Sequence, residues 1–175
     1  MVRFIDPATI IAQMGLQNGQ TVADLGCGSG FYAVAAGQRV GSTGTVYAVD
    51  VQEAKLVATQ SAARQSGLKN ISVLHADLDK PLLDIAENSC DALILASIIH
   101  EVESRDMLLK NAYRILKTGG RLAVVEWKKE ATPLGPDIAR RVGREELDQL
   151  LVKAGFRKEQ DLEADNYHYA ELFVK

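Results

Sequence analysis

Three glycines at alternate positions follow a short apolar run near the beginning of the chain. The run, Thr21 to Leu25, carries Asp24 next to its end, and the segment Gly26-Cys27-Gly28-Ser29-Gly30 comes directly after it. Glycine adopts positive φ angles and has no Cβ, so a ligand can lie against its backbone. A strand, a glycine-rich turn and a helix from Phe31 to Val40 form the geometry of nucleotide-cofactor sites. A tight strand-to-helix connection without a ligand is the alternative explanation.

The spacing of these glycines disfavours one class of cofactor. A dinucleotide fingerprint needs its third glycine three residues after Gly28, where this chain has Phe31, and the third glycine is instead Gly30. The turn is therefore poorly suited to a pyrophosphate group. A phosphate-free adenosine cofactor fits the spacing better.

Acidic residues follow the next two predicted strands. Asp50 ends the run Thr45 to Asp50, and Asp77 follows the run Ile71 to His75. Ligands of open α/β sheets gather at the carboxyl ends of the strands, near the switch in strand order. Asp50 can accept hydrogen bonds from both hydroxyls of a ribose through its two carboxylate oxygens. It can also cap the helix that starts at Gln52, and the two roles can coexist.

The candidate catalytic residue follows the fourth predicted strand. His100 lies four residues after the strand Asp91 to Ala96, and it could accept a proton from a substrate hydroxyl or an acidic carbon. The alternative is a polar wall group that orients the substrate without transferring a proton. Glu101 either orients His100 or is simply solvated. Tyr32 and Trp127 are candidate pocket walls or core residues.

The elements that position these residues alternate between strand and helix. A short helix begins at Asp6-Pro7 and ends at Gly15, and with almost nothing before this helix any lid is expected to be small. The later predicted elements are a helix at Gln52 to Ser66, a loose helical connection at Pro81 to Glu87, a helix at Arg105 to Lys117 with a turn at Thr118 to Gly120, a strand at Arg121 to Trp127, a last helix marked by Leu147 to Ala154, and strands at Lys158 to Ala164 and His168 to Val174.

This alternation predicts an α/β fold with three layers around a doubly wound, mostly parallel, seven-stranded sheet. The last two strands are separated by only three residues, Asp165 to Tyr167. So short a connection cannot be a crossover, so the two strands should form a C-terminal antiparallel hairpin.

Length and composition are typical of a single-domain enzyme. The chain has 175 residues, 47% hydrophobic and 25% charged, with a net charge of −3, and we expect one domain over residues 1–175. We expect neither a nucleic-acid partner, since no basic stripe is visible, nor membrane insertion, since no long apolar span is present. Cys27 and Cys90 form no metal-binding spacing, so no metal is expected. The expected compartment is the cytoplasm, and the oligomeric state is left open.

These motifs resemble those of the class I S-adenosylmethionine (SAM)-dependent methyltransferases, whose motif I is an acidic residue followed by alternating glycines. The chain is most similar to their small-molecule group, often called type 11 methyltransferases. Leu116 to Leu122 resembles that group's segment before the fifth strand, although Thr118 stands where proline is usual, and Ala154-Gly155-Phe156 resembles its turn after the last helix. The resemblance implies the Rossmann-like methyltransferase fold, SAM as cofactor, S-adenosylhomocysteine as product and a small-molecule methyl acceptor.

The resemblance also implies roles for individual residues. Asp77 resembles the acid that accepts a hydrogen bond from the adenine amino group, with a solvated turn residue as the alternative. Val51 and Leu78 would lie against adenine, and Cys27 is expected to be a small loop residue rather than a nucleophile. The residues expected to bind the cofactor are Asp24, Gly26, Cys27, Gly28, Gly30, Asp50, Val51, Asp77, Leu78 and Ser97.

Methyl transfer by in-line displacement is the reaction that these features favour. The sulfonium of the cofactor is already activated, so the protein would act mainly by positioning the acceptor. A non-catalytic SAM-binding module is the alternative, and a nicotinamide-dependent oxidoreductase is a remote one. The segment Glu130 to Arg141 has no readable pattern, and its pair Arg140-Arg141 could meet an anionic substrate or nothing.

Overall fold

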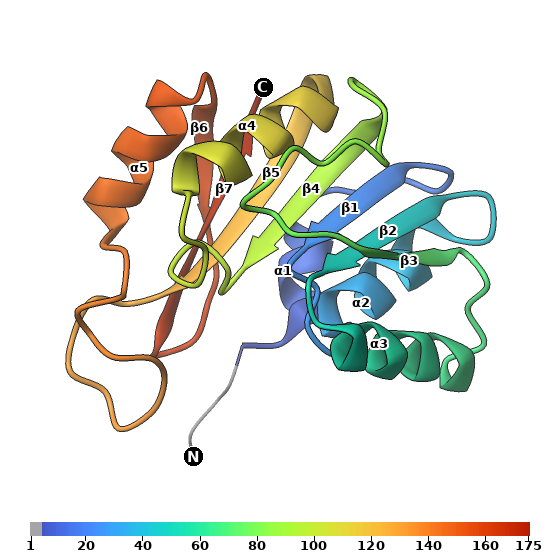
Figure 1. Cartoon of the computed structure of the whole chain (residues 1–175), viewed down its shortest axis with the longest axis horizontal. Helices are drawn as coiled ribbons and strands as arrows, with labels where there is room; N and C mark the ends of the chain where they lie inside the picture. The colour runs from blue at the N-terminus through green and yellow to red at the C-terminus, as the bar shows by residue number, and fades with distance from the viewer. Residues whose placement is uncertain (1–4) are drawn as a thin grey trace.

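A seven-stranded sheet lies between two layers of helices in the computed structural model, which describes residues 5–175 (Figure 1). The first four residues of the predicted domain therefore lie outside the described part of the chain. The helices are α1 (Pro7–Gln13), α2 (Phe31–Val40), α3 (Glu53–Gln65), α4 (Arg105–Ile115) and α5 (Arg144–Lys153). The strands are β1 (Thr21–Leu25), β2 (Thr45–Asp50), β3 (Ile71–His75), β4 (Cys90–Ala96), β5 (Leu116–Trp127), β6 (Arg157–Leu162) and β7 (His168–Val174).

The strand order is β3-β2-β1-β4-β5-β7-β6. Strands β1 to β5 are parallel, β7 is antiparallel to β5, and β6 is antiparallel to β7. The predicted doubly wound, mostly parallel sheet with a C-terminal antiparallel hairpin is therefore confirmed. The order reverses between β1 and β4, so the loops after these two strands diverge and leave room for a ligand at the carboxyl edge.

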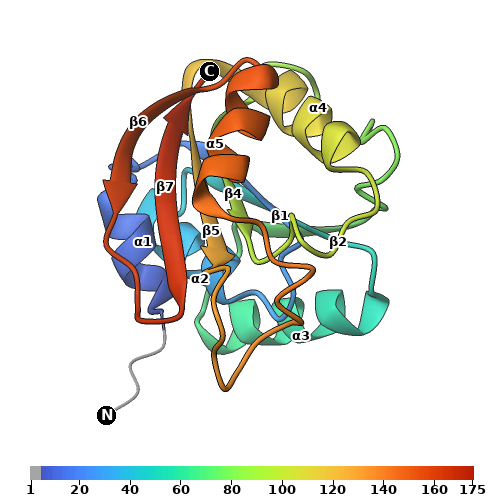
Figure 2. The ribbon, with the colours of Figure 1, turned by 90° about the vertical axis from the view of Figure 1, so that its left-hand side faces the viewer.

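Two buried apolar clusters hold the three layers together. One cluster joins α1, α2 and α3 to one face of the sheet, with Ile10, Ala36 and Leu56 among its members. The other joins α4 and α5 to the opposite face, with Leu108 and Leu151 among its members. Figure 2 shows β7 between α1 on one side and α5 on the other. The sheet is thus buried on both faces, as a parallel sheet requires.

One predicted element is wrong. The sequence predicted a loose helical connection at Pro81 to Glu87, but this segment has no helix. Its backbone is bound instead by two side chains of α4. Asn111 accepts a hydrogen bond from the Leu82 N–H and donates to the carbonyls of Leu78 and Lys80, and Arg114 donates to the carbonyls of Leu82 and Ile85. These bonds replace the internal hydrogen bonds that a helix would make.

Several predicted boundaries also move. The largest shift concerns β5, which begins at Leu116 rather than at the predicted Arg121, so the predicted helix ends at Ile115 and not at Lys117. Leu116 has an extended backbone and pairs with Cys90, which lengthens β4 by one residue. Gly119 and Gly120 exchange backbone hydrogen bonds with Lys175, so the predicted turn is part of a ladder.

A buried charged cluster joins α5 to the C-terminal hairpin. Glu171 of β7 is fully buried, and its Oε1 lies 2.6 Å from Lys158 Nζ and 3.2 Å from Arg144 Nη1. Lys158 also contacts Asp148 and Asp161. Burial raises the pKa of Glu171, the hydrogen bond from Lys158 opposes this rise, and Asp148 adds to it. The carboxylate of Glu171 therefore depends on the two cations beside it.

Replacing Lys158 with methionine tests this dependence. We expect Lys158→Met to lower the free energy of unfolding by about 1–3 kcal/mol, because it leaves a buried acceptor poorly satisfied. The loss should grow with pH. A carboxyl group whose pKa is raised by folding contributes stability at low pH and loses it as pH rises through the folded-state value, and removing Lys158 raises that value further.

Urea unfolding at about pH 5 and about pH 8 measures both effects. Lys153→Met, which changes an exposed lysine of α5, is the matched control and should lose little at either pH. An equal loss of unfolding free energy in both variants would contradict the dependence of Glu171 on Lys158. A loss in Lys158→Met that does not grow with pH would contradict it as well.

Candidate active site

A cavity of about 900 Å³ opens at the carboxyl edge of the sheet. Its walls come from the segments that follow β1, β2, β3 and β4, together with the beginning of α1. Of the residues expected to bind the cofactor, those that line the cavity are Gly26, Cys27, Gly28, Asp50, Val51, Asp77, Leu78 and Ser97. The sheet topology therefore brings together residues that are more than seventy positions apart in the sequence.

Each of the three glycines in the turn is placed by a different constraint. All three have positive φ angles: 79° at Gly26, 53° at Gly28 and 84° at Gly30. A Cβ on Gly26 would lie 2.6 Å from the Ile98 side chain, and a Cβ on Gly30 would lie 2.8 Å from Thr59. A Cβ on Gly28 would meet no atom within 4 Å. Gly26 and Gly30 thus permit close packing of the protein, and Gly28 leaves space beside the cavity.

The peptide groups of Gly28 are bound from two sides. Its N–H donates to Asp50 Oδ2 at 2.9 Å, and its carbonyl accepts from Thr59 Oγ1 at 2.9 Å. Asp50 Oδ1 accepts from the Gln52 N–H at the beginning of α3, also at 2.9 Å. Asp50 therefore does act at the start of α3, and it also orders the glycine turn. Each oxygen has a second lone pair that remains available to a ligand hydroxyl. The role of Thr59 carried no sequence signal.

Asp24 lies behind the turn and is almost completely buried. Burial raises its pKa to about 7; a backbone hydrogen bond with Ala33 opposes the rise and the charge of Asp50 adds to it. Its Oδ2 is buried and has no hydrogen-bond partner among the described residues. Such an oxygen requires a donor or a cation, because a buried unpaired acceptor is costly. Neither Asp24 nor Gly30 lines the cavity directly.

Cys27 has the properties of a structural thiol. It is buried, and burial, with a smaller contribution from the charge of Asp24, raises the pKa of its thiol to about 12. The thiolate is the reactive form of cysteine. A protonated buried thiol in the turn agrees with the expectation of a small loop residue.

The residues after β2 and β3 form one end of the cavity. Leu78 is buried, whereas Val51 is 55% exposed although it is apolar. Asp77 Oδ1 accepts from the Asp79 N–H, and Asp77 Oδ2 lies 2.9 Å from Lys80 Nζ. The hydrogen bond from Lys80 is the main cause of the lowered pKa of Asp77. Asp77 is therefore ionised in an exposed turn that borders the cavity, a position compatible with both of its proposed roles.

The segment after β4 leaves the sheet through a strained residue. Ser97 has a φ angle of 55°, and its N–H still donates to the carbonyl of Val125 on β5. A non-glycine residue in this region is uncommon and costs energy. The sharp turn brings Ile98 against Gly26 and places Glu101 and Val102 on the cavity wall.

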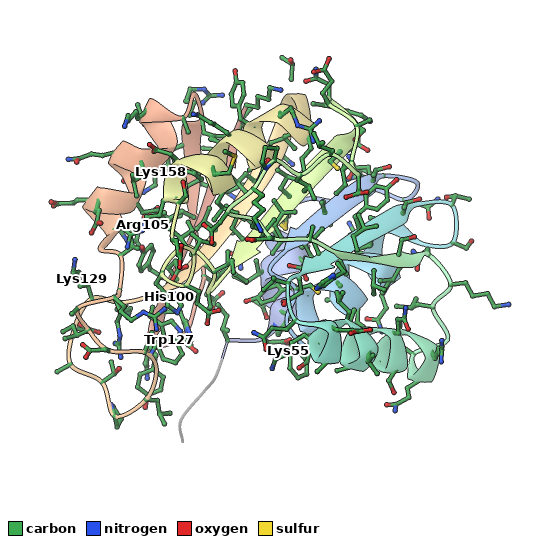
Figure 3. The ribbon with its side chains drawn as sticks, viewed as in Figure 1. Lys55, His100, Arg105, Trp127, Lys129 and Lys158 are labelled. Carbon is green, nitrogen blue, oxygen red and sulfur yellow. The ribbon has the colours of Figure 1, made fainter. Side chains whose placement is uncertain are left out.

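His100 lies beside the cavity but does not line it. Its side chain is 4% exposed, and its Nδ1 lies 2.8 Å from Glu126 Oε2. Its Nε2 lies 3.9 Å from Oε1 of Glu101, which does line the cavity. Figure 3 shows His100 on the side of the carboxyl edge that is away from Lys55 of α3. Sequence reasoning missed Glu126, although an acid within the apolar strand Leu122 to Trp127 was a usable signal.

Arg140 and Arg141, at the end of the segment Glu130 to Arg141, have different environments. Arg141 is buried, and its guanidinium lies 5.4 Å from the Trp127 ring centroid and donates to oxygens of its own loop. Its acceptors are the carbonyls of Lys128, Glu130, Leu134 and Pro136 and the hydroxyl of Thr132. Arg141 therefore holds the loop between β5 and α5, which projects beyond the sheet in Figures 1 and 2. Exposed Arg140 donates to the His100 carbonyl at 3.4 Å.

The two aromatic candidates for pocket walls also differ. Tyr32 lines the cavity, and its hydroxyl is buried with no hydrogen-bond partner among residues 5–175. Trp127 lies outside the cavity, where it packs against the His168 ring, 4.1 Å away between centroids, and against Gly135. Tyr32 is therefore a wall residue, and Trp127 supports the loop after β5.

Acids outnumber bases on the cavity wall. The acidic residues that line it are Asp50, Asp77, Asp79 and Glu101, and Lys55 is the one cation among the described lining residues. Apolar lining comes from several elements and includes Ile5, Phe31, Ile98 and Val102. The cavity therefore favours a cationic or neutral ligand with apolar surface.

Residues 5–175 provide neither a metal-binding cluster nor a membrane-spanning helix. No cluster of three or more histidine, cysteine, aspartate or glutamate side chains is close enough to hold a metal ion. None of the described helices has the length and apolar character needed to span a membrane.

Comparisons with known proteins agree with the geometry. The family described as "Methyltransferase domain" matches residues 16–163. The ubiquinone/menaquinone biosynthesis C-methyltransferase UbiE of Haemophilus ducreyi is 34% identical over 116 residues, which cover 66% of this chain and 44% of that protein. The chain thus spans less than half the length of the curated relatives it matches.

Solved structures share the whole fold. A SAM dependent methyltransferase from Aquifex aeolicus superposes with a TM-score of 0.89 at 31% identity, covering 98% of this chain and 91% of that one. Phosphoethanolamine N-methyltransferase 2 of Haemonchus contortus, solved with SAM, has a TM-score of 0.75 at 18% identity and covers 97% of this chain and 52% of its own. At that identity the second comparison shows the fold alone.

Alanine at Gly28 tests whether the open space beside this glycine receives a ligand. We expect Gly28→Ala to weaken SAM binding by about 1–3 kcal/mol, the usual cost of overpacking, while the fold persists. The matched control is Gly67→Ala, at the end of α3, because Gly67 also has a positive φ angle, 69°, and open space at its Cβ. Both variants carry similar backbone strain, so only the first should lose affinity in calorimetry. Equal affinities would show that the ligand does not approach Gly28.

Proposed function

Because this chain belongs to the class I SAM-dependent methyltransferase superfamily, we propose that it transfers a methyl group from SAM to a neutral small-molecule acceptor. The observation that carries this proposal is the cavity that joins the glycine turn to the acids after β2 and β3. Its size is within the range typical of small-molecule sites.

The residues present fit the cofactor. Asp50 would bind the ribose hydroxyls, and Val51 and Leu78 would lie on either side of adenine, which accounts for the large exposure of Val51. Asp77 would accept from the adenine amino group. The unpartnered Oδ2 of Asp24 would receive the positive charge of the methionine end, directly or through water. When bound, SAM supplies a methyl group attached to a positively charged sulfur, which leaves with the bonding electron pair.

The cavity wall supports a neutral acceptor with apolar surface. Acidic side chains predominate there, so a phosphate or carboxylate on the acceptor would be repelled. The same acidity disfavours nucleic acid as a substrate. The name of the curated relatives specifies C-methylation in ubiquinone and menaquinone biosynthesis. We therefore propose an electron-rich aromatic acceptor, methylated at carbon, as the finer assignment.

His100 is the proposed general base. Its Nδ1 faces Glu126, so Nε2 is the nitrogen left to accept a proton from the acceptor. Oε1 of Glu101, a residue that lines the cavity, is 3.9 Å from Nε2. Proton transfer to Nε2 would require the exposed Glu101 side chain to make room for the acceptor. The alternative role, a polar group that orients the acceptor, uses the same location without proton transfer.

Calorimetry with three ligands tests the cofactor assignment. We expect SAM and S-adenosylhomocysteine to bind and NAD not to bind, because the glycine spacing provides no pyrophosphate turn. Affinity for SAM should fall from about pH 8 to about pH 6, by at most about tenfold per pH unit, as Asp24 becomes protonated and stops attracting the cation. The pKa of Asp24 is about 7, so the fall should begin near neutral pH. Asp24→Asn should bind weakly without this pH dependence.

Two results would overturn the cofactor assignment or its electrostatic explanation. Tighter binding of NAD than of either adenosyl ligand would assign the chain to nicotinamide chemistry. A pH dependence that persists in Asp24→Asn would move the titrating group elsewhere.

An acceptor screen with matched charges tests the reaction. Phenols, quinols, amines and thiols should be compared with their carboxylated or phosphorylated analogues, and we expect methylation only of members that carry no carboxylate or phosphate. With the acceptor in hand, His100→Ala should lose roughly 10²- to 10⁴-fold in turnover, the usual contribution of a general base. SAM affinity should be unchanged. SAM binding without turnover on any acceptor would support a binding module instead, and a higher KM with unchanged turnover would make His100 an orienting group.

A further inference from the structure

We propose that Glu126 is a positioning residue that fixes both the segment after β4 and the tautomer of His100. This inference rests on the proposed function, because it explains how the proposed base is held ready. It concerns a residue of β5 that does not line the cavity.

Both carboxylate oxygens of Glu126 bind the segment after β4. Its side chain is fully buried, Oε1 accepts from the Ile99 N–H at 2.8 Å, and Oε2 lies 2.8 Å from His100 Nδ1. A carboxylate can only accept hydrogen bonds, so Nδ1 must carry the proton. Nε2 of the neutral imidazole then has a free lone pair, which is the state that a general base requires.

Packing alone does not explain this glutamate. The positions beside it on β5, from Leu122 to Val125, are apolar and buried. Burying a charged group costs free energy unless it is fully hydrogen-bonded, and a well-packed apolar residue would avoid that cost. What the carboxylate adds is a pair of directed bonds to a strained turn, which begins at Ser97 with a positive φ angle. The bonds hold Ile99 and His100, which lie in the sequence between the lining residues Ile98 and Glu101.

Glu126 binds Nδ1 and leaves the other ring nitrogen without this partner. That nitrogen, Nε2, lies 3.9 Å from Oε1 of Glu101, which lines the cavity. The charged or titratable groups around the imidazole are Glu101, Glu126, Arg105 bound to the Ile99 carbonyl, Arg140 bound to the His100 carbonyl, and Tyr169 opposite Glu126 on β7.

The proposed step balances as a simple proton transfer. The acceptor loses a proton from O–H or C–H to Nε2, and the electron pair of that bond remains on the acceptor as it bonds to the methyl carbon. The imidazolium that forms is stabilised by the Glu126 carboxylate 2.8 Å from Nδ1. Glu126 itself neither gives up nor accepts a proton.

Replacing Glu126 with glutamine removes the charge and changes the hydrogen bond to His100, while the side chain keeps nearly the same shape. In Glu126→Gln the amide oxygen can still accept from Ile99, but the amide NH₂ can only donate to His100 Nδ1. The proton of the neutral ring should therefore move to Nε2, where it blocks proton acceptance. We expect turnover to fall roughly 10²- to 10⁴-fold with SAM affinity unchanged.

Nitrogen-15 NMR of the histidines shows which ring nitrogen carries the proton, and this measurement does not require catalytic turnover. We expect His100, assigned by its absence in His100→Ala, to carry its proton on Nδ1 in the ligand-free wild type and on Nε2 in Glu126→Gln. Glu126→Asp keeps the carboxylate and should retain the Nδ1 proton and part of the turnover. Glu103→Gln changes an exposed acid of the same loop and should leave spectrum and rate unchanged.

The outcomes separate the inference from the function on which it rests. An Nε2 proton in the wild type, or wild-type turnover in Glu126→Gln, would overturn the role of Glu126 even if methylation is confirmed. Failure of the wild type to methylate any acceptor would contradict the proposed function. The NMR comparison of the wild type with Glu126→Gln would still show whether Glu126 sets the tautomer of His100. If Glu126→Gln does not fold, the wild-type spectrum and Glu126→Asp provide the same decision.

Discussion

The peptide groups of Gly28 are the point on which the cofactor side of the site depends. Asp50 binds the N–H and Thr59 binds the carbonyl, so the ends of β1 and β2 and one face of α3 are connected through a single glycine. The connection requires a backbone with a positive φ angle and no side chain in the way. Because the same Asp50 also binds the start of α3, moving one of these elements would move the others.

Buried acids in the sheet show three ways of keeping a carboxyl group away from water. Glu171 is paired with cations through Oε1 although its Oε2 has no partner among the described residues, Glu126 binds two groups of one loop, and Asp24 has no cation beside its unpartnered Oδ2. The first arrangement is structural, and the second holds a loop in place. The third leaves a buried oxygen behind the glycine turn without a donor among the described residues, and the proposed cofactor would supply the missing positive charge.

Local patterns in the sequence were sufficient for the fold and for much of the cavity wall. The glycine turn and the acids after β2 and β3 follow predicted strands directly, so strand order alone brings them together. The segment at Pro81 to Glu87 was misjudged because its backbone bonds go to Asn111 and Arg114, which lie on a later helix. Glu126 stands out as an acid in an apolar strand, but its partners, which belong to the neighbouring strand's loop, could not be read from that pattern. Side-chain partners that are distant in sequence leave no periodic signal.

The loop between β5 and α5 is organised around the guanidinium of Arg141, which binds oxygens contributed along most of the loop's length. Four of these five acceptors are main-chain carbonyls, whose presence does not depend on residue type. The exposed positions of the loop, such as Leu134 and Ile138, can therefore diverge while its path is retained. Sequence change at these positions is thereby separated from the glycine turn, although Arg140 connects the loop to the His100 carbonyl.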